Sequence, residues 1–160
     1  MAIFENPNDP AQPKEGVYGW YAIKNGQDTA IYVGMAGKKN AYIPKGTLFR
    51  GVSELQRNTF TSNAPRYDKL DIDFIVGTAI IYFEKHGYSC VWRHICNDPT
   101  REREYVNKQK PLLQDHRNAN IISEYRIKKE ADGYWKHKKS PLGVKEAEDE
   151  IFSILKKYIA

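Results

Sequence analysis

The chain of 160 residues is long enough for one domain with a hydrophobic core and too short for two. Its net charge of +5 and pI of about 9.1 permit a polyanionic partner without requiring one. No apolar stretch approaches about 18 residues, and no basic start precedes an apolar run at the N-terminus. We therefore expect no membrane span and no secretory signal, but a cytoplasmic protein. Cys90 and Cys96 match no common zinc-ligand spacing.

The first third of the chain predicts an irregular arm, a β-hairpin and a short helix. Residues 1–13 hold three prolines among polar residues, which favours an irregular arm. Residues 16–24 and 29–35 flank Asn25-Gly26, a strong turn signal, and predict the two strands of a hairpin. A polar loop follows, and then a helix is predicted over about 47–57. Its apolar stripe is Leu48, Val52 and Leu55.

The remaining chain predicts two helices around a third strand, and a last helix near the C-terminus. Apolar residues recur at three- and four-residue steps from residue 71 to 83, which is typical of a helix. Residues 88–96 are rich in aromatic and β-branched residues and predict a strand. Asp98-Pro99 can begin the next helix, which Pro111 ends, and a last helix is predicted over about 144–158. The order β-β-α-α-β-α predicts an α+β fold.

Two short motifs lie one on each hairpin strand: Gly16-Val17-Tyr18 and Tyr32-Val33-Gly34. Together with the downstream residues described below, they resemble the motifs of the GIY-YIG nuclease superfamily. The loop over 36–46 is similar to loops inserted at the same place in the type II restriction endonuclease branch of that superfamily. The resemblance covers residues 14–120. It implies a small three-stranded antiparallel sheet flanked by helices, with 1–13 as an irregular arm. Residues 121–160 would form a basic, aromatic segment and a C-terminal helical extension.

The resemblance also implies two tyrosines beside a bound phosphodiester, of which one would be Tyr32. The other is open between Tyr18, which lies in the better motif, and Tyr21, which has the usual spacing to Tyr32. Pairing parity separates them, because side chains alternate between the two faces of a sheet. An even-length hairpin loop puts Tyr21 on the face of Tyr32, whereas an odd loop or a bulge puts Tyr18 there. We favour Tyr18.

Glu102 is the candidate metal ligand. The family carries a glutamate on the helix after the third strand, about nine residues before a proline, and Glu102 and Pro111 keep that spacing. At about 100° per residue, Tyr105 and Val106 lie on the face of Glu102, whereas Glu104 points the other way. The resemblance therefore implies that Glu102 holds one Mg²⁺ or Mn²⁺ ion. A single carboxylate leaves most of the coordination to water, which suits Mg²⁺.

Arg50 is the candidate catalytic cation, because the family places an arginine on the first helix. It lies off the apolar stripe of that helix, and Lys45 and Lys39 are fallback cations. The family often has an asparagine three residues after the helix-ending proline. This chain has Gln114 there, and Asn118 or Asn120 could substitute.

Two groups of basic residues are candidates for contacts with DNA phosphates. One follows the hairpin, and the other is interleaved with aromatic residues that could stack on bases or sugars. The candidate DNA-binding residues are Lys38, Lys39, Lys45, Arg57, Lys128, Lys129, Lys136, Lys138 and Lys139.

These features predict a metal-dependent DNA endonuclease that hydrolyses phosphodiester bonds, most consistent with a small restriction-type enzyme. We expect DNA as the partner, no membrane, and a possible homodimer on DNA. The alternatives are a structure-selective repair, recombination or homing-type nuclease, and a nucleic-acid-binding module that kept the fold without cleavage.

Overall fold

A computed structural model describes residues 2–9, 12, 14–37, 46–57, 67–114 and 144–159 of the chain. Its four strands form one mixed sheet in the order β1-β4-β2-β3. The strands are β1 (Ile3–Glu5), β2 (Gly16–Lys24), β3 (Gln27–Ala36) and β4 (Ser89–Cys96). β2 pairs antiparallel with both β3 and β4, as predicted, whereas β1 pairs parallel with β4. The α+β class is confirmed, and the prediction of a purely antiparallel, three-stranded sheet is wrong at this edge.

β1 also corrects the prediction that residues 1–13 are irregular throughout. The side chain of Phe4 packs edge-on against Trp20, with ring centroids 5.3 Å apart, and lies 5.5 Å from the ring of Trp92. Such aromatic contacts stabilise a strand that is too short to show a period-2 pattern in the sequence. The prolines near β1 led to the prediction of an irregular arm, and the strand was therefore not predicted.

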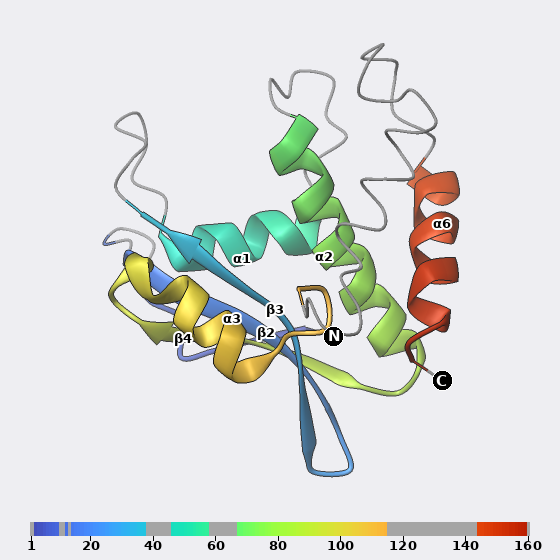
Figure 1. Ribbon diagram of the computed structural model, residues 1–160, viewed down its shortest axis with the longest axis horizontal. Helices are drawn as coiled ribbons and strands as arrows, with labels where there is room; N and C mark the ends of the chain where they lie inside the picture. The colour runs from blue at the N-terminus through green and yellow to red at the C-terminus, as the bar shows by residue number, and fades with distance from the viewer. Residues whose placement is uncertain are drawn as a thin grey trace.

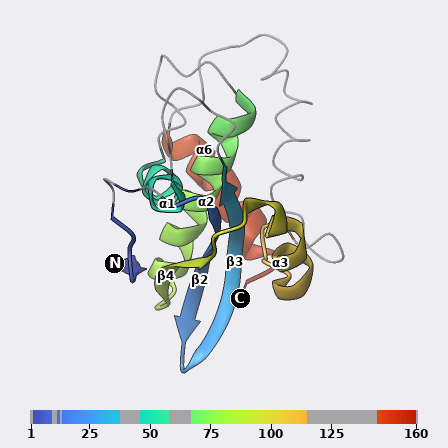
Figure 2. The same ribbon diagram turned by 90° about the vertical axis from the view of Figure 1, so that its left-hand side faces the viewer.

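The helices begin and end close to their predicted positions. They are α1 (Thr47–Gln56), α2 (Tyr67–Lys85), α3 (Glu102–Gln109) and α6 (Val144–Lys156), with the short 3₁₀ helix η2 (Pro99–Arg101) leading into α3. The Asp98 carboxylate accepts a hydrogen bond from the Thr100 amide at 3.0 Å and caps η2. Figures 1 and 2 show α1 and α2 on one side of the sheet, with α3 beside β3 and away from them.

One hydrophobic core joins the sheet to α2 and α6. It includes Trp20, Trp92, Phe74 and Phe83, and the C-terminal helix contributes its apolar face: Ile151, Ile154 and Leu155. α6 lies alongside α2 (Figure 1), so the helix expected as an extension is part of the same packed core. Within the described residues, no helix combines the length and apolar character needed to cross a membrane.

Candidate active site

A β-bulge in the hairpin decides which tyrosines share a face of the sheet. Lys24 pairs with Gln27 around the two-residue turn, and Tyr21 pairs with Ala30 in the same register. The next pair is Trp20 with Tyr32, so Ile31 is one extra residue on β3. Beyond the bulge, Tyr18 lies opposite Gly34. Tyr18, Trp20 and Tyr32 therefore point to one face, and the rings of Tyr18 and Tyr32 lie 6.4 Å apart.

Tyr21 points to the other face, because neighbouring residues of a strand alternate. Its hydroxyl donates a hydrogen bond to the side chain of Gln109 on α3 at 2.6 Å, and the Arg93 guanidinium lies 5.0 Å from its ring centroid. The two-residue turn alone would have favoured Tyr21 as the partner of Tyr32. The bulge reverses that outcome and places Tyr18 there.

Helix α1 turns a polar face toward these tyrosines. Thr47, Gly51 and Glu54 are buried, whereas Leu48, Val52 and Leu55 of the predicted stripe are only half-buried. Gly51 permits close packing, because a Cβ atom there would lie 2.6 Å from the indole of Trp92. Because α1 lies close to the sheet, the Glu54 side chain points from α1 toward the sheet and contacts β2.

Glu54 is a fully enclosed carboxylate with two hydrogen-bond donors from β2. The Tyr18 hydroxyl donates to its Oε2 at 2.7 Å, and the Trp20 indole donates to its Oε1 at 3.1 Å. Burial raises the pKa of Glu54 to about 8, although Arg50 and the Tyr18 hydrogen bond act in the opposite direction. Glu54 was not predicted from the sequence. The only local signal was its position one helical turn after Arg50.

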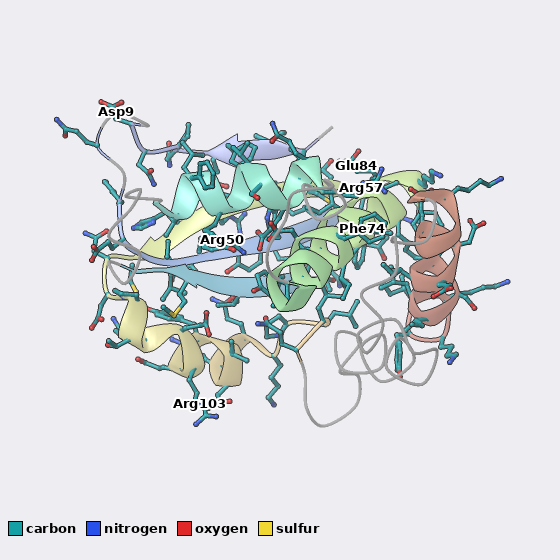
Figure 3. All side chains as sticks on the ribbon, turned by 90° about the horizontal axis from the view of Figure 1, so that it is seen from above. Asp9, Arg50, Arg57, Phe74, Glu84 and Arg103 are labelled. Carbon is teal, nitrogen blue, oxygen red and sulfur yellow. The ribbon has the colours of Figure 1, made fainter. Side chains whose placement is uncertain are left out.

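Arg50 lies between α1, α2 and the sheet (Figure 3), next to two carboxylates. Its Nη2 atom is 2.9 Å from Oδ1 of Asp73 on α2 and 4.0 Å from Oε2 of Glu54. Ser53 donates to the second oxygen of Asp73 at 2.8 Å. Burial alone would lower the pKa of Arg50, but the nearby Tyr18, Glu54 and Asp73 keep it raised and the guanidinium charged. The Arg50 side chain is 24% exposed, so part of it faces outward.

The two tyrosines differ in how available their hydroxyl groups are. Tyr18 is completely buried and its hydroxyl is bound to Glu54. Tyr32 is 8% exposed, and its hydroxyl has no hydrogen-bond partner among the described residues. Burial raises the pKa of both phenols well above 10, with Glu54 adding to the rise. Both hydroxyl groups are therefore neutral donors or acceptors at neutral pH.

Glu102 lies at the start of α3 and faces inward as predicted. It is half-buried with Tyr105 and Val106, whereas Glu104 is exposed and forms two hydrogen bonds with Arg101, at 2.8 and 3.0 Å. Burial raises the pKa of Glu102, and its charge in turn helps to raise the pKa of Tyr32 on β3, the strand that α3 contacts.

The donor set at Glu102 fits a mostly hydrated Mg²⁺ ion. No hydrogen bond or ion pair to the described residues occupies its carboxylate, in contrast to that of Glu104. Within the described ranges no cluster of three or more His, Cys, Asp or Glu residues could hold a metal ion. An ion at Glu102 would therefore keep most of its water ligands, as Mg²⁺ commonly does.

Gln114 occupies a structural position beside Tyr32. Its side-chain amide accepts from the Val33 amide and donates to the Val33 carbonyl, both at 2.8 Å. Leu112 and Leu113 donate to the carbonyls of Ala30 and Ile31. This segment thus follows the outer edge of β3, and Gln114 fixes the backbone next to Tyr32. Asn118 and Asn120 lie outside the described residues.

Of the candidate DNA-binding residues, only Arg57 lies within the described part of the chain. Its guanidinium is 2.8 Å from the carboxylate of Glu148 on α6 and 5.3 Å from the Phe74 ring centroid. Arg57 therefore joins α1 to α2 and α6. The other candidates lie outside the described ranges: Lys38, Lys39, Lys45, Lys128, Lys129, Lys136, Lys138 and Lys139.

The arrangement combines a partly exposed arginine and a tyrosine hydroxyl without a described partner on one face of the sheet, with an unpaired carboxylate on α3 beside β3. An arginine and a hydroxyl suit an anionic oxygen such as that of a phosphodiester, and a carboxylate suits a hard cation. Comparison with protein-family models, curated proteins and solved structures found no match.

Proposed function

We propose that this chain is a metal-dependent DNA endonuclease of the GIY-YIG type, with a restriction-type role. The observation that supports it best is the convergence of Tyr18 and Tyr32 with Arg50 on one face of the sheet. These residues come from three different elements, and a bulge in the hairpin aligns the two tyrosines. Glu102 adds a carboxylate without a described partner on α3, the helix beside β3. Metal-dependent phosphodiester hydrolysis uses a cation for the phosphate and a ligand for the metal ion, and Arg50 and Glu102 would take these roles.

Each residue of the candidate site would have a separate role in the hydrolysis. Arg50 contacts a non-bridging oxygen and stabilises the charge that grows in the transition state, a contribution of about 3–4 kcal/mol for a preorganised donor. Tyr32 uses its free hydroxyl to orient the attacking water. Tyr18 holds Glu54 beneath Arg50 rather than contacting DNA. An Mg²⁺ or Mn²⁺ ion bound by Glu102 would supply Lewis-acid stabilisation of the phosphate and of the leaving oxygen.

The raised pKa values of the two phenols argue for hydrogen bonding over base catalysis. A phenolate at either position would have to form in an enclosed site that already contains carboxylates. Arg50 acts against this rise but does not offset it. We therefore assign Tyr32 the role of positioning water and not of removing its proton.

A plasmid-nicking assay tests the proposed function. Supercoiled DNA with Mg²⁺ should be nicked or linearised, and EDTA should stop the reaction. Glu102→Gln should reduce cleavage at least a hundredfold and leave DNA binding intact. Glu104→Gln is the matched control, because it changes a glutamate two positions away that faces solvent, and it should cleave like wild type. Cleavage by Glu102→Gln above a tenth of the wild-type rate would remove Glu102 from the metal role.

The same assay distinguishes the alternative nucleases. Fragments of defined length from linear DNA indicate a restriction-type enzyme, whereas preference for branched or nicked substrates indicates a repair or recombination enzyme. If a homodimer binds DNA, both strands should be cut within one binding event.

A non-catalytic nucleic-acid-binding module is the second candidate, and the Arg50–Asp73 pair favours it. The Asp73 carboxylate already accepts a hydrogen bond from the Arg50 guanidinium, which the reaction would need for the phosphate. DNA binding that depends on Arg50, with no cleavage under any divalent metal, would support this candidate over the first.

A further inference from the structure

The enclosed group around Arg50 contains more negative than positive charge. Its charged members within the described part of the chain are Arg50, Glu54 and Asp73, which together carry one net negative charge when both carboxylates are ionised. Glu54 is fully buried and Asp73 is 6% exposed, which limits the screening of these charges by water. Among the described residues, no second cation pairs with either carboxylate.

The groups that face Glu54 come from each surrounding element. β2 contributes the Tyr18 hydroxyl and the Trp20 indole, β3 contributes the neutral Tyr32, and α2 contributes Asp73. Arg50 is the one cation among the described residues, and its short contact goes to Asp73 at 2.9 Å rather than to Glu54 at 4.0 Å. Of the two carboxylates, Glu54 therefore forms the weaker ion pair with Arg50 and is the less exposed to solvent.

We propose that Glu54 takes up a proton when a phosphodiester binds Arg50, so that neutral Glu54 is part of the DNA-bound state. This inference rests on the proposed function, because it takes the ligand of Arg50 to be a DNA phosphate. Without a metal ion, the phosphate would add a second net negative charge to an enclosed site. A proton from solvent on Glu54 restores the charge present before binding.

The hydrogen bonds of Glu54 can accommodate this proton. In the ionised state, Tyr18 and Trp20 both donate to the carboxylate. Once Oε2 carries a proton, it donates to the Tyr18 oxygen across the same 2.7 Å contact, and the phenol must turn its own proton elsewhere. Burial raises the pKa of Glu54 to about 8, so near pH 8 a substantial part of the free protein carries an ionised Glu54 that can take up a proton.

Proton uptake on binding makes DNA affinity depend on pH in a defined direction. If the bound state holds one more proton than the free state, affinity falls as pH rises, by at most about tenfold per pH unit. This loss begins as the pH approaches the pKa of Glu54 in the free protein. Phosphate groups themselves do not change charge in this range, and neither does Arg50.

Titration calorimetry of the full-length protein with duplex DNA in EDTA tests the proton uptake. Measurements at pH 8 in buffers with different ionisation enthalpies give the number of protons exchanged on binding. Wild type should take up a substantial fraction of one proton. Glu54→Gln, which has the shape of the protonated side chain, should take up none and should bind with little pH dependence. Glu104→Gln should behave like wild type.

A second variant keeps the test valid if Glu54→Gln folds poorly. Asp73→Asn removes the other negative charge, so DNA can bind without a compensating proton and the uptake should fall. Wild-type binding without proton uptake, or unchanged uptake in Glu54→Gln, overturns the inference and leaves the proposed nuclease intact, because nicking is measured separately. A protein that neither binds nor nicks DNA overturns both.

Discussion

The tip of the Tyr18 side chain occupies the space above Gly34, its pairing partner on β3. A Cβ atom at Gly34 would lie 2.5 Å from the Tyr18 hydroxyl and 2.8 Å from the Tyr32 ring. The glycine that closes the Tyr32-Val33-Gly34 motif is therefore needed for close packing. It lets Tyr18 lie flat enough on the sheet to reach Glu54.

Gly34→Ala should destabilise the protein by about 1–3 kcal/mol, because overpacking an enclosed site displaces side chains. The change should also weaken the hydrogen bond from Tyr18 to Glu54. Urea unfolding measures the free-energy change. Gly37→Ala is the matched control: its nearest neighbour would be the Met35 side chain at 3.5 Å, an ordinary contact. Equal stability of the two variants would contradict the packing role of Gly34.

The three hairpin tyrosines should respond differently to the loss of a hydroxyl group. Tyr32→Phe should lower the cleavage rate severely at nearly wild-type stability, because that hydroxyl bonds to no described residue. Tyr18→Phe should also lower stability, by about 1–3 kcal/mol, since it leaves a buried carboxylate oxygen without its donor. Tyr21→Phe should have only a mild effect on the cleavage rate. Single-turnover rates and thermal melts separate the three, and a dead Tyr21→Phe with active Tyr18→Phe would point to the other face of the sheet.

Arg50→Ala should reduce turnover more than DNA affinity, because the charge matters most in the transition state. The expected loss in single-turnover rate is about a hundredfold or more. A hundredfold loss of affinity at an unchanged rate would instead make Arg50 a phosphate anchor.

Asp73→Asn should have the opposite effect on binding, because it removes a competitor for the Arg50 guanidinium. DNA should bind more tightly, and the stability should fall through the loss of the partly buried ion pair. Fluorescence anisotropy at several salt concentrations measures the affinity. Weaker binding by Asp73→Asn would indicate that Asp73 holds Arg50 in its productive position.

Glu54 should make the stability of the free protein fall with rising pH. Its folded pKa of about 8 lies above the unfolded value near 4.5, so the folded state binds more protons between these values. The contribution of Glu54 is complete below about pH 4.5 and is lost as pH rises toward 8, at no more than about 1.4 kcal/mol per pH unit. Glu54→Gln should remove this dependence and be the more stable form at pH 9. Parallel pH–stability curves for the two proteins would contradict a raised pKa.

The sequence located most elements because their signals are local. The Asn25-Gly26 turn, the cap at Asp98 and the regular apolar spacing of α2 each depend on a few neighbouring residues. β1 was missed because its stability comes from the packing of Phe4 on Trp20 and Trp92, which are distant in the chain.

The candidate site was predictable only in part, for the same reason. Helix geometry predicted that Glu102 faces inward. Nothing in the sequence indicated that Glu54 and Asp73 belong to the candidate site. The apolar stripe of α1 suggested that Leu48, Val52 and Leu55 face inward. In fact Gly51 brings the polar side of the helix onto the sheet, and the hydrogen bonds from Tyr18 and Trp20 compensate the burial of Glu54. Such compensation depends on tertiary pairing and not on the helix's own pattern.

The side chain of Gln114 imitates the backbone of a neighbouring strand, with one acceptor and one donor set against Val33. An exposed strand edge is a template for pairing with another chain and for aggregation. Together with the amides of Leu112 and Leu113, Gln114 closes this edge without adding a strand. Along Ala30 to Val33, the backbone of the tyrosine-bearing hairpin is thereby protected from edge-to-edge pairing with another molecule.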